Sequence, residues 1–399
     1  MAHGGLSKAR LARMHRVMSA HVERGTVAGM VTLLSRHGDT IVDTVGVQDL
    51  TRRDPMRRDS IFRIASMTKP VTAVAAMILV EECRITLDEP LDAFLPELAD
   101  RRVLQRIDGP LDATVPASRP LTLRDLLTFR MGLGMLMSPP GVFPIQKTME
   151  EHVIMSLSPA PPHSPDEWLR RLGTLPLMHQ PGERWMYHTG SDVLGVLIAR
   201  VAGQSFERFL KERIFDPLGM RDTGFFVPAP KLGRFASCYS PGPAAGALEL
   251  IDDGQNSKWS RAPAFPAGGA GLVSTIDDYA AFGRMLLGKG KLGSERILAR
   301  PTVEEMLRDQ ITPEQKANSP FSPGFWDCRG WGLGLSVITG RANTAVGPGQ
   351  FGWSGAFGTD WVSDSCEDLV AIMMIQRYTM GPVRIHEDFR TSVYQSIDD

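Results

Sequence analysis

Ser66 and Lys69 are the pair of residues whose types and spacing could do covalent chemistry. They lie at the start of the apolar run I-A-S-M-T-K-P-V-T-A-V-A-A-M-I-L-V, which predicts a helix. Residues three apart share one face of a helix, so the serine Oγ and the lysine Nζ can touch. Pro70 restricts both residues to the first turn, where free backbone N–H groups favour negative charge. Apolar surroundings disfavour the ammonium form of Lys69, and a neutral amine can take the proton of Ser66.

The S-x-x-K spacing alone leaves a second interpretation open. A serine at this position can simply cap the helix, and a lysine can extend its amine to solvent. The nucleophile interpretation therefore depends on further acid, base and oxyanion groups elsewhere in the chain.

Tyr187 is the candidate for a second general acid or base. It lies in P-G-E-R-W-M-Y-H-T-G-S-D, just before a helix predicted to begin near Asp192. A phenolate close to Lys69 could relay a proton to a leaving group. Tyr239 lies in a loop with no helix behind it, and Tyr279 lies inside D-D-Y-A-A-F, where packing is the natural role.

The segment F-G-W-S-G-A-F-G-T-D-W-V-S-D could supply the oxyanion site. Glycines beside Trp353 and Ser354, ahead of a β run, predict a strand edge where backbone can approach a ligand closely. The free N–H of Ala356 could then complete an oxyanion hole with the N–H of Ser66. Standing alone, the segment would be interpreted as a glycine-rich bend, and Tyr187 as a packed loop residue.

His188 suggests a Ser-His-Asp triad, but its context argues against one. Alternation along an extended loop would aim its side chain away from Tyr187. The sequence has no G-x-S-x-G elbow, because G-W-S-G-A departs at its last position. We therefore expect His188 to be packed or solvated rather than catalytic. The nine histidines have no metal-ligand spacing, so neither a metal nor a cofactor is expected.

The composition is that of an ordinary globular protein. The chain has 399 residues, 43% hydrophobic and 22% charged, with a formal net charge of −1. Lys and Arg are spread along it, which argues against nucleic acid or a membrane surface as partner and favours a small-molecule substrate. The N-terminus has no export-signal pattern and the longest apolar run is too short for a membrane span, so we expect a cytoplasmic protein. The four cysteines lie far apart and are expected to be reduced and mostly buried.

Periodicity predicts the elements that would position these residues. An amphipathic helix over 6–24 precedes two β runs, 30–36 and 40–47, which H-G-D joins into a hairpin. The Ser66 helix ends near Glu82, and helical pieces then alternate with Pro- and Gly-rich loops. The remaining predicted elements are helices over 123–129, 166–172, 192–201, 206–215, 277–287 and 383–395, and β runs over 333–338, 359–363 and 369–376.

The order of these elements predicts an α+β fold with a discontinuous sheet domain. The first hairpin and the last strands would form one antiparallel sheet, flanked by the terminal helices, from residues 1–85 and 260–399. Residues 86–259 would form an inserted, mostly helical domain. Loops such as M-G-L-G-M-L-M-S-P-P-G-V-F-P suggest an apolar acyl pocket or lid.

Taken together, these motifs resemble those of the serine β-lactamase and penicillin-recognising family, and most closely its class C β-lactamase-like (family VIII) carboxylesterases. The resemblance runs in order through S-M-T-K, L-T-L-R-D-L-L-T-F-R-M-G-L, P-G-E-R-W-M-Y-H-T-G-S-D-V-L-G, G-G-A-G-L-V-S-T-I-D-D-Y and W-S-G. It implies a β-lactamase/transpeptidase-like fold with the active site in the cleft between the two parts. It also implies Ser66 as the acylated nucleophile, Lys69 and Tyr187 as the base system, and Ala356 and Ser66 as the oxyanion-hole donors.

Departures from the family pattern bear on the substrate. Trp353-Ser354-Gly355, the candidate substrate-binding residues, stand where β-lactamases and DD-peptidases carry Lys-Thr-Gly or His-Thr-Gly, so the cation that would attract a substrate carboxylate is missing. Thr189 stands where true β-lactamases have Asn, and the Ser-Asp-Asn loop and deacylating glutamate of class A enzymes have no recognisable counterpart. The resemblance therefore favours esters of small or medium acyl groups, with at most weak β-lactam turnover.

Three alternatives remain open at the level of sequence. Acyl transfer to an alcohol or amine needs the same acyl-enzyme and differs only in the second nucleophile. Amides, including D-amino-acid peptides, are a further substrate class. A non-catalytic descendant that binds or scaffolds is the alternative outside enzymes. The oligomeric state stays open as well.

Overall fold

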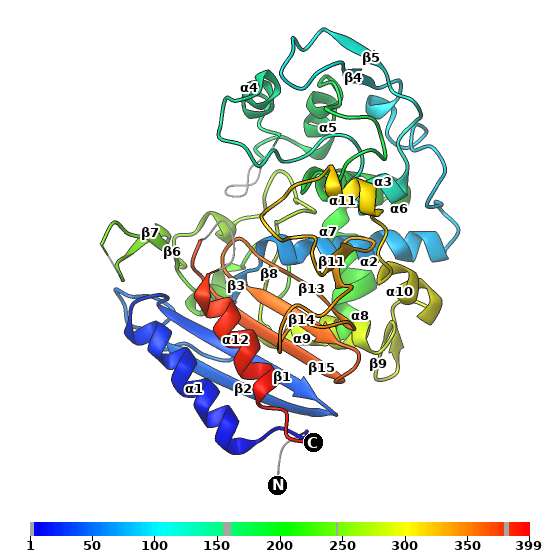
Figure 1. The fold of residues 1–399 in the computed structure, drawn as a ribbon. Helices are drawn as coiled ribbons and strands as arrows, with labels where there is room; N and C mark the ends of the chain where they lie inside the picture. Colours follow the sequence, from blue (N-terminus) through cyan, green and yellow to red (C-terminus); the bar gives the residue numbers. More distant parts are fainter. Residues whose placement is uncertain (1–3, 155–160, 245, 379–382) are drawn as a thin grey trace.

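One seven-stranded antiparallel sheet organises the molecule (Figure 1). The computed structural model describes residues 4–154, 161–244, 246–378 and 383–399. The strand order is β11-β12-β13-β14-β15-β1-β2, and every neighbouring pair is antiparallel. The strands are β1 (Gly29–Arg36), β2 (Asp39–Gly46), β11 (Arg329–Trp331), β12 (Ser336–Ile338), β13 (Gln350–Ser354), β14 (Asp360–Asp364) and β15 (Leu369–Ile375). Because β1 pairs with both β2 and β15, the first hairpin and the last strands share one sheet, as predicted.

The terminal helices α1 (Lys8–Glu23) and α12 (Arg384–Gln395) lie side by side on one face of this sheet (Figure 1). Met18 of α1 and Phe389 of α12 are buried with Met30 and Ile375 of the strands beneath them. The opposite face packs against α9 (Ile276–Leu287). Both faces are therefore covered, and the predicted α+β fold with flanking terminal helices is confirmed.

The apolar run after Ser66 forms the central helix α2 (Thr68–Glu81). A single 3₁₀ turn over Ala65–Met67 precedes it, and β3 (Phe62–Arg63), paired with β8 (Val273–Ser274), leads into that turn. The helix is apolar all round because it is buried all round, between the sheet core and α6 (Thr189–Ala202). These buried surroundings hold the start of the helix, and with it the side chains of Ser66 and Lys69, in place.

The interval between residues 86 and 259 contains mainly short helices and two small hairpins. Three of its helices, α3, α5 and α7, pack on α6, and apolar side chains of α3 and α5 join the same large core as α2. The boundaries predicted for an inserted domain remain a prediction. The elements in this interval, besides α6, are β4 (Arg102–Leu104), β5 (Thr114–Pro116), α3 (Leu123–Leu127), α4 (Pro144–Glu151), α5 (Pro165–Gly173), α7 (Phe206–Leu210), α8 (Asp216–Leu218), β6 (Cys238–Pro241) and β7 (Leu248–Asp252).

Several elements of the last third differ from the sequence prediction. The predicted β run over 333–338 begins only at Ser336, because Gly332 N–H bonds to the carbonyl of Leu335 in a turn. Short elements that carry too few residues for a periodic signal were not predicted. They are α10 (Arg300–Met306), α11 (Pro313–Ala317), β9 (Lys291–Leu292), β10 (Glu295–Arg296) and β11.

The cysteines correct one expectation. All four are free thiols, but only Cys238 is buried, while Cys83 and Cys366 are exposed and Cys328 is half-buried. Cys83 lies in the turn that ends α2, with φ of 54°, and Cys366 lies in the tight turn between β14 and β15. Turns lie at the surface, so their position overrides the usual preference of cysteine for the interior. Within the described residues, no helix is long and apolar enough to cross a membrane.

Candidate active site

Ser66 and Lys69 meet at the start of α2. Lys69 Nζ lies 3.0 Å from Ser66 Oγ. The serine lies in the 3₁₀ turn, and the lysine is the second residue of the helix. Tyr279 of α9 donates its hydroxyl to the carbonyl of Met67 over 2.8 Å, which fixes the turn from below and gives this tyrosine the packing role predicted for it. The predicted contact between Ser66 and Lys69 is therefore present.

Lys69 is fully buried, and its amine has three neighbours. Besides Ser66 Oγ, they are the carbonyl oxygen of Gly269 at 2.6 Å and Nδ1 of His188 at 3.1 Å. Burial lowers the pKa of Lys69 to about 7, and the negative charge of Asp192 acts in the opposite direction. An amine with this pKa has a substantial neutral fraction near pH 7, and that form can accept a proton.

Tyr187 lies beside this pair, but not as the sequence suggested. Lys69 Nζ lies over its ring, 4.5 Å from the centroid. The hydroxyl oxygen of Tyr187 accepts a hydrogen bond from Trp353 Nε1 over 2.7 Å. Burial raises the pKa of Tyr187, although hydrogen bonds with Ser66 and Trp353 oppose the shift. The resting group is therefore a phenol able to donate a proton, and the expected phenolate is disfavoured because the site is dry.

The predicted direction of His188, away from Tyr187, is wrong, although its side chain is packed as expected. The backbone at His188 is a γ-turn, with φ of 86° and ψ of −66°, closed by Thr189 N–H on the carbonyl of Tyr187 at 3.3 Å. This turn breaks the alternation of an extended loop and aims the imidazole at Lys69. His188 is only 2% exposed, and its Nε2 lies 3.1 Å from Oδ2 of Asp192. Helix α6 begins at Thr189, earlier than predicted, which places Asp192 one turn into the helix.

Gly355 brings the end of β13 against the backbone that precedes Ser66. A Cβ on Gly355 would lie 2.4 Å from the carbonyl oxygen of Ile64, so only glycine fits this approach. Ala356 and Ala65 then pack in one apolar cluster. Within the described ranges, the N–H groups of Ser66 and Ala356 donate no hydrogen bond. Two unpaired donors on neighbouring segments are the arrangement that an oxyanion hole requires.

The other two residues of the W-S-G segment lie within β13, between β12 and β14. The segment predicted to form a strand edge is therefore an interior strand, β13. Free backbone N–H groups begin only beyond Ser354, where β13 ends. The hydroxyl of Ser354 donates to Asp360 Oδ1 over 2.6 Å, and Arg390 also binds this carboxylate at 2.8 Å. Trp353 contacts Tyr187, as described above. The structure thus pairs Ser354 with Asp360 and places Trp353 against Tyr187.

An aromatic cluster lines the site next to Tyr187. Trp353 and Trp331 meet edge to face with centroids 4.8 Å apart, and Trp185 stacks on Tyr187 at 5.6 Å. Sequence reasoning missed most of this cluster, although the density of aromatic residues in F-S-P-G-F-W-D-C-R-G-W was a usable signal. The cluster comprises Phe129, Trp185, Tyr187, Trp331 and Trp353, with Met135, Phe321, Phe325 and Trp326 packed at its margin.

Comparison with known proteins agrees with this geometry. A family model described as Beta-lactamase matches residues 14–395. The chain belongs to the β-lactamase family. Among curated proteins it is 40% identical to protein Rv1367c of Mycobacterium tuberculosis (89% of this chain, 87% of the relative) and 30% identical to esterase EstB of Burkholderia gladioli (91% and 89%). Among solved structures it superposes on EstCE1, described as a hydrolase with promiscuous acyltransferase activity, with a TM-score of 0.81 and 25% identity over 97% of this chain and 99% of that one.

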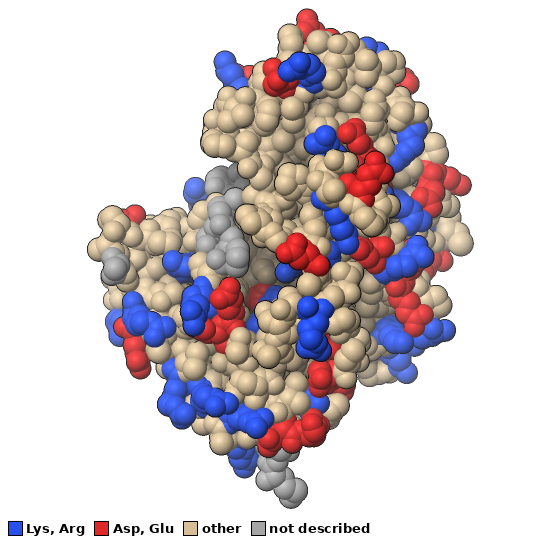
Figure 2. Space-filling view, in the orientation of Figure 1, with Lys and Arg blue, Asp and Glu red and all other residues tan. Residues whose placement is uncertain are grey.

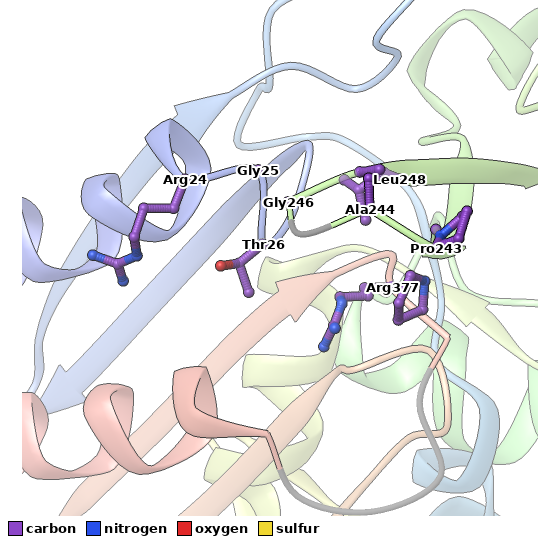
Figure 3. Close-up of a pocket in the computed structure, with 11 residues that line it drawn as sticks. Arg24, Gly25, Thr26, Pro243, Ala244, Gly246, Leu248 and Arg377 are labelled. Atoms are coloured by element: carbon purple, nitrogen blue, oxygen red, sulfur yellow. The ribbon is translucent and has the colours of Figure 1, made fainter.

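These relatives make the chain an enzyme of the hydrolase type within the β-lactamase family, with esterases and acyltransferases among its kin. The described residues contain no group of His, Cys, Asp and Glu that could hold a metal ion. A separate surface pocket lies between the end of α1 and the β6–β7 hairpin (Figure 3). Its described lining includes Arg24, Thr26 and Arg377 but no carboxylate, imidazole or lysine, so it offers no general base for family chemistry.

Proposed function

We propose that this protein is a serine esterase that forms an acyl-enzyme at Ser66. The observation that carries the proposal is the 3.0 Å contact between Ser66 Oγ and the buried amine of Lys69. A lysine whose pKa burial has lowered to about 7 can accept the serine proton without a histidine between them. The esterase among the relatives supports the same chemistry.

Acylation then proceeds by a proton-balanced sequence. The Ser66 proton passes to Lys69 as Oγ attacks the ester carbonyl carbon, and the N–H groups of Ser66 and Ala356 receive the oxyanion. Collapse of the tetrahedral intermediate breaks the bond to the alcohol, whose oxygen takes the proton of Tyr187. The ammonium of Lys69 returns a proton to the tyrosine, and the neutral base is restored. Water repeats the steps in deacylation and releases the acid.

The environment of the site favours uncharged, apolar esters. The aromatic cluster gives the walls an apolar character, and Met135, at its margin, donates its backbone N–H to the carbonyl of Tyr187 at 2.8 Å. Trp353 occupies the position of the cation that would attract a substrate carboxylate, so β-lactams are at best poor substrates. Positive and negative side chains are interspersed over the face of the molecule in Figure 2, which gives no single-sign field to attract a polyanion.

The test is hydrolysis of p-nitrophenyl butyrate by the purified chain and by Ser66→Ala. We expect activity in the wild type, loss of at least about 10³-fold in the variant, and no change in a control, Ser294→Ala, at an exposed serine in the β9–β10 turn. A fluorophosphonate should label the wild type at Ser66, located by peptide mass analysis. An inactive and unlabelled wild type would refute the esterase proposal and support a binding protein instead.

Acyl transfer to an alcohol is the second candidate, because the aromatic cluster beside Tyr187 could exclude water and hold an acceptor. The transferase reaction uses the same acyl-enzyme, so only the partition of products separates it from hydrolysis. Ester formed from p-nitrophenyl butyrate and an added alcohol, in a ratio to butyrate that rises with alcohol concentration, would support transfer. Butyrate alone at high alcohol concentration would exclude it.

A further inference from the structure

Four residues close a ring of contacts behind the nucleophile. Lys69 Nζ contacts the carbonyl oxygen of Gly269 at 2.6 Å, and the N–H of the same glycine donates to Asp192 Oδ1 at 2.7 Å. The other carboxylate oxygen, Oδ2, lies 3.1 Å from His188 Nε2, and His188 Nδ1 lies 3.1 Å from Lys69 Nζ. A Cβ on Gly269 would lie 2.9 Å from Asp192 and 3.0 Å from His188, so the ring closes only around a glycine.

These contacts determine which atoms of the ring carry a proton and which only accept. An ionised Asp192 can only accept, so it accepts the Gly269 N–H and holds the imidazole proton on Nε2 of His188. Nδ1 is then a bare acceptor that faces Lys69. The carbonyl of Gly269 is an acceptor too. A neutral amine has two N–H bonds and one lone pair, and these two acceptors engage both N–H bonds.

We propose that His188 and Asp192 are positioning residues, which orient the neutral amine of Lys69 so that its one lone pair points at the hydroxyl of Ser66. The inference rests on the proposed acyl-enzyme function and names the groups that make Lys69 an effective base. The histidine and aspartate of a triad are thus present, but they act on the serine through the lysine.

The backbone supports this assignment. A γ-turn with φ of 86° is strained for a residue with a Cβ. This strained turn aims the His188 imidazole at Lys69 and so allows the ring of contacts to close. Apart from one another, the titratable side chains that face Lys69 and His188 within the described chain are Tyr187 and Asp192. Burial lowers the pKa of His188, and Lys69 lowers it further whenever its amine is protonated, so the imidazole stays neutral.

A matched pair of substitutions tests the acceptor at Nδ1. His188→Leu keeps the size and apolar contacts but has no acceptor, whereas His188→Asn places an amide oxygen near the position of Nδ1. We expect kcat for p-nitrophenyl butyrate to fall about 10²-fold in the leucine variant and to stay within about tenfold of the wild type in the asparagine variant. Wild-type activity in His188→Leu, or equal losses in both variants, would overturn the proposal.

The pH profile separates positioning from direct base catalysis. Asparagine does not titrate, so the acidic limb of kcat/KM should persist in His188→Asn because Lys69 carries it. A profile without this limb would assign the base to His188 itself and overturn the proposal.

A direct measurement needs neither turnover nor these variants. Nitrogen NMR of Ser66→Ala labelled at histidine nitrogens should detect His188 protonated on Nε2 and bare on Nδ1 at pH 8. In Asp192→Asn, added to the same background, the amide can donate to Nε2 and should shift the proton to Nδ1. A proton on Nδ1 with Asp192 intact would overturn the proposal. Labelling of the wild type separates the proposed acyl-enzyme function from the positioning role. If a fluorophosphonate labels wild-type Ser66 but His188→Leu keeps full activity, only the positioning role is refuted.

Discussion

The indole N–H of Trp353 donates to the hydroxyl oxygen of Tyr187 over 2.7 Å. This contact leaves the phenol proton free to point toward Ser66, because the oxygen accepts from the indole and its own hydrogen must turn elsewhere. It also stabilises negative charge on the tyrosine oxygen when the proton leaves. Trp353, which stands where the family pattern has a substrate-binding cation, thus helps to orient the Tyr187 phenol as a proton donor.

Trp353→Phe should lower kcat for ester hydrolysis by about tenfold. Phenylalanine keeps an aromatic ring against Trp331, but Tyr187 loses a hydrogen bond that stabilises its anionic form, worth about 1.5 kcal/mol for a charged partner. Steady-state kinetics with p-nitrophenyl butyrate measures the change. The matched control is Trp168→Phe, which removes an indole bond to the carbonyl of Ile154 away from the site and should leave kcat within twofold. Equal losses in both variants would contradict a specific role for Trp353.

The pH dependence of kcat/KM should have an acidic limb with an apparent pKa near 7. Lys69 must be neutral to accept the Ser66 proton, so protonation below its lowered pKa removes the base, and the rate falls tenfold per unit at low pH. A neutral ester substrate does not ionise in this range, so the substrate adds no limb to the pH profile. Asp192 raises the pKa of Lys69, so Asp192→Asn should move the limb to lower pH even as kcat falls. A limb that moves upward in this variant would contradict the assignment.

Lys69→Met should be inactive and more stable than the wild type at neutral pH. The pKa of Lys69 is about 7 in the folded chain, against an ordinary value of 10.5 that applies to the unfolded chain. Between pH 7 and 10.5, therefore, the unfolded chain holds the proton and the folded chain does not. The destabilisation of the wild type is therefore fully present below pH 7 and fades as pH rises toward 10.5. Denaturant unfolding from pH 7 to 10 should give a stability advantage of the variant that shrinks by about 1.4 kcal/mol per pH unit. A constant difference would mean that Lys69 is charged when folded.

Gly355→Ala should damage both the oxyanion site and the fold. Its Cβ would lie 2.4 Å from the Ile64 carbonyl and 2.3 Å from Thr359 Oγ1, so the backbone beside Ser66 or the end of β13 must move. We expect a loss of about 1–3 kcal/mol in unfolding free energy and a fall in kcat of roughly 10- to 100-fold, since one oxyanion donor is worth about 10²–10³. Gly233→Ala, where an added Cβ meets nothing within 4 Å, is the control. Normal kinetics in Gly355→Ala would argue that Ala356 lies outside the site.

The parts of the site that follow from local spacing were predictable. Ser66 and Lys69 are three residues apart in one helical turn, and Pro70 sets where that turn lies, so their contact needs no knowledge of the rest of the chain. The first and last strands of the chain carry clear apolar patterns, and the antiparallel sheet follows from pairing them. The aromatic density of residues 321–331 could indicate a cluster but not its location, because aromatic side chains from separate loops meet only in the folded chain.

His188 marks the limit of local reasoning. Alternation predicts its direction only for an extended backbone, and the γ-turn at this residue is imposed by the packing of Tyr187 and the early start of α6. The contact with Lys69 spans 119 positions in the sequence. Tertiary packing, rather than residue type, therefore decided whether this imidazole faces solvent or the base.

By itself the sequence determined the contact between Ser66 and Lys69 and the pairing of the first and last strands in one antiparallel sheet, because these depend on helical spacing and strand periodicity. Only the tertiary structure decided how the lysine is tuned and aimed. Burial that lowers the pKa of Lys69 arises from helices and loops distant in sequence, and the acceptors that orient its amine come from His188 and Gly269. A pKa and the direction of a lone pair are properties of the surroundings, and those exist only once the chain is folded.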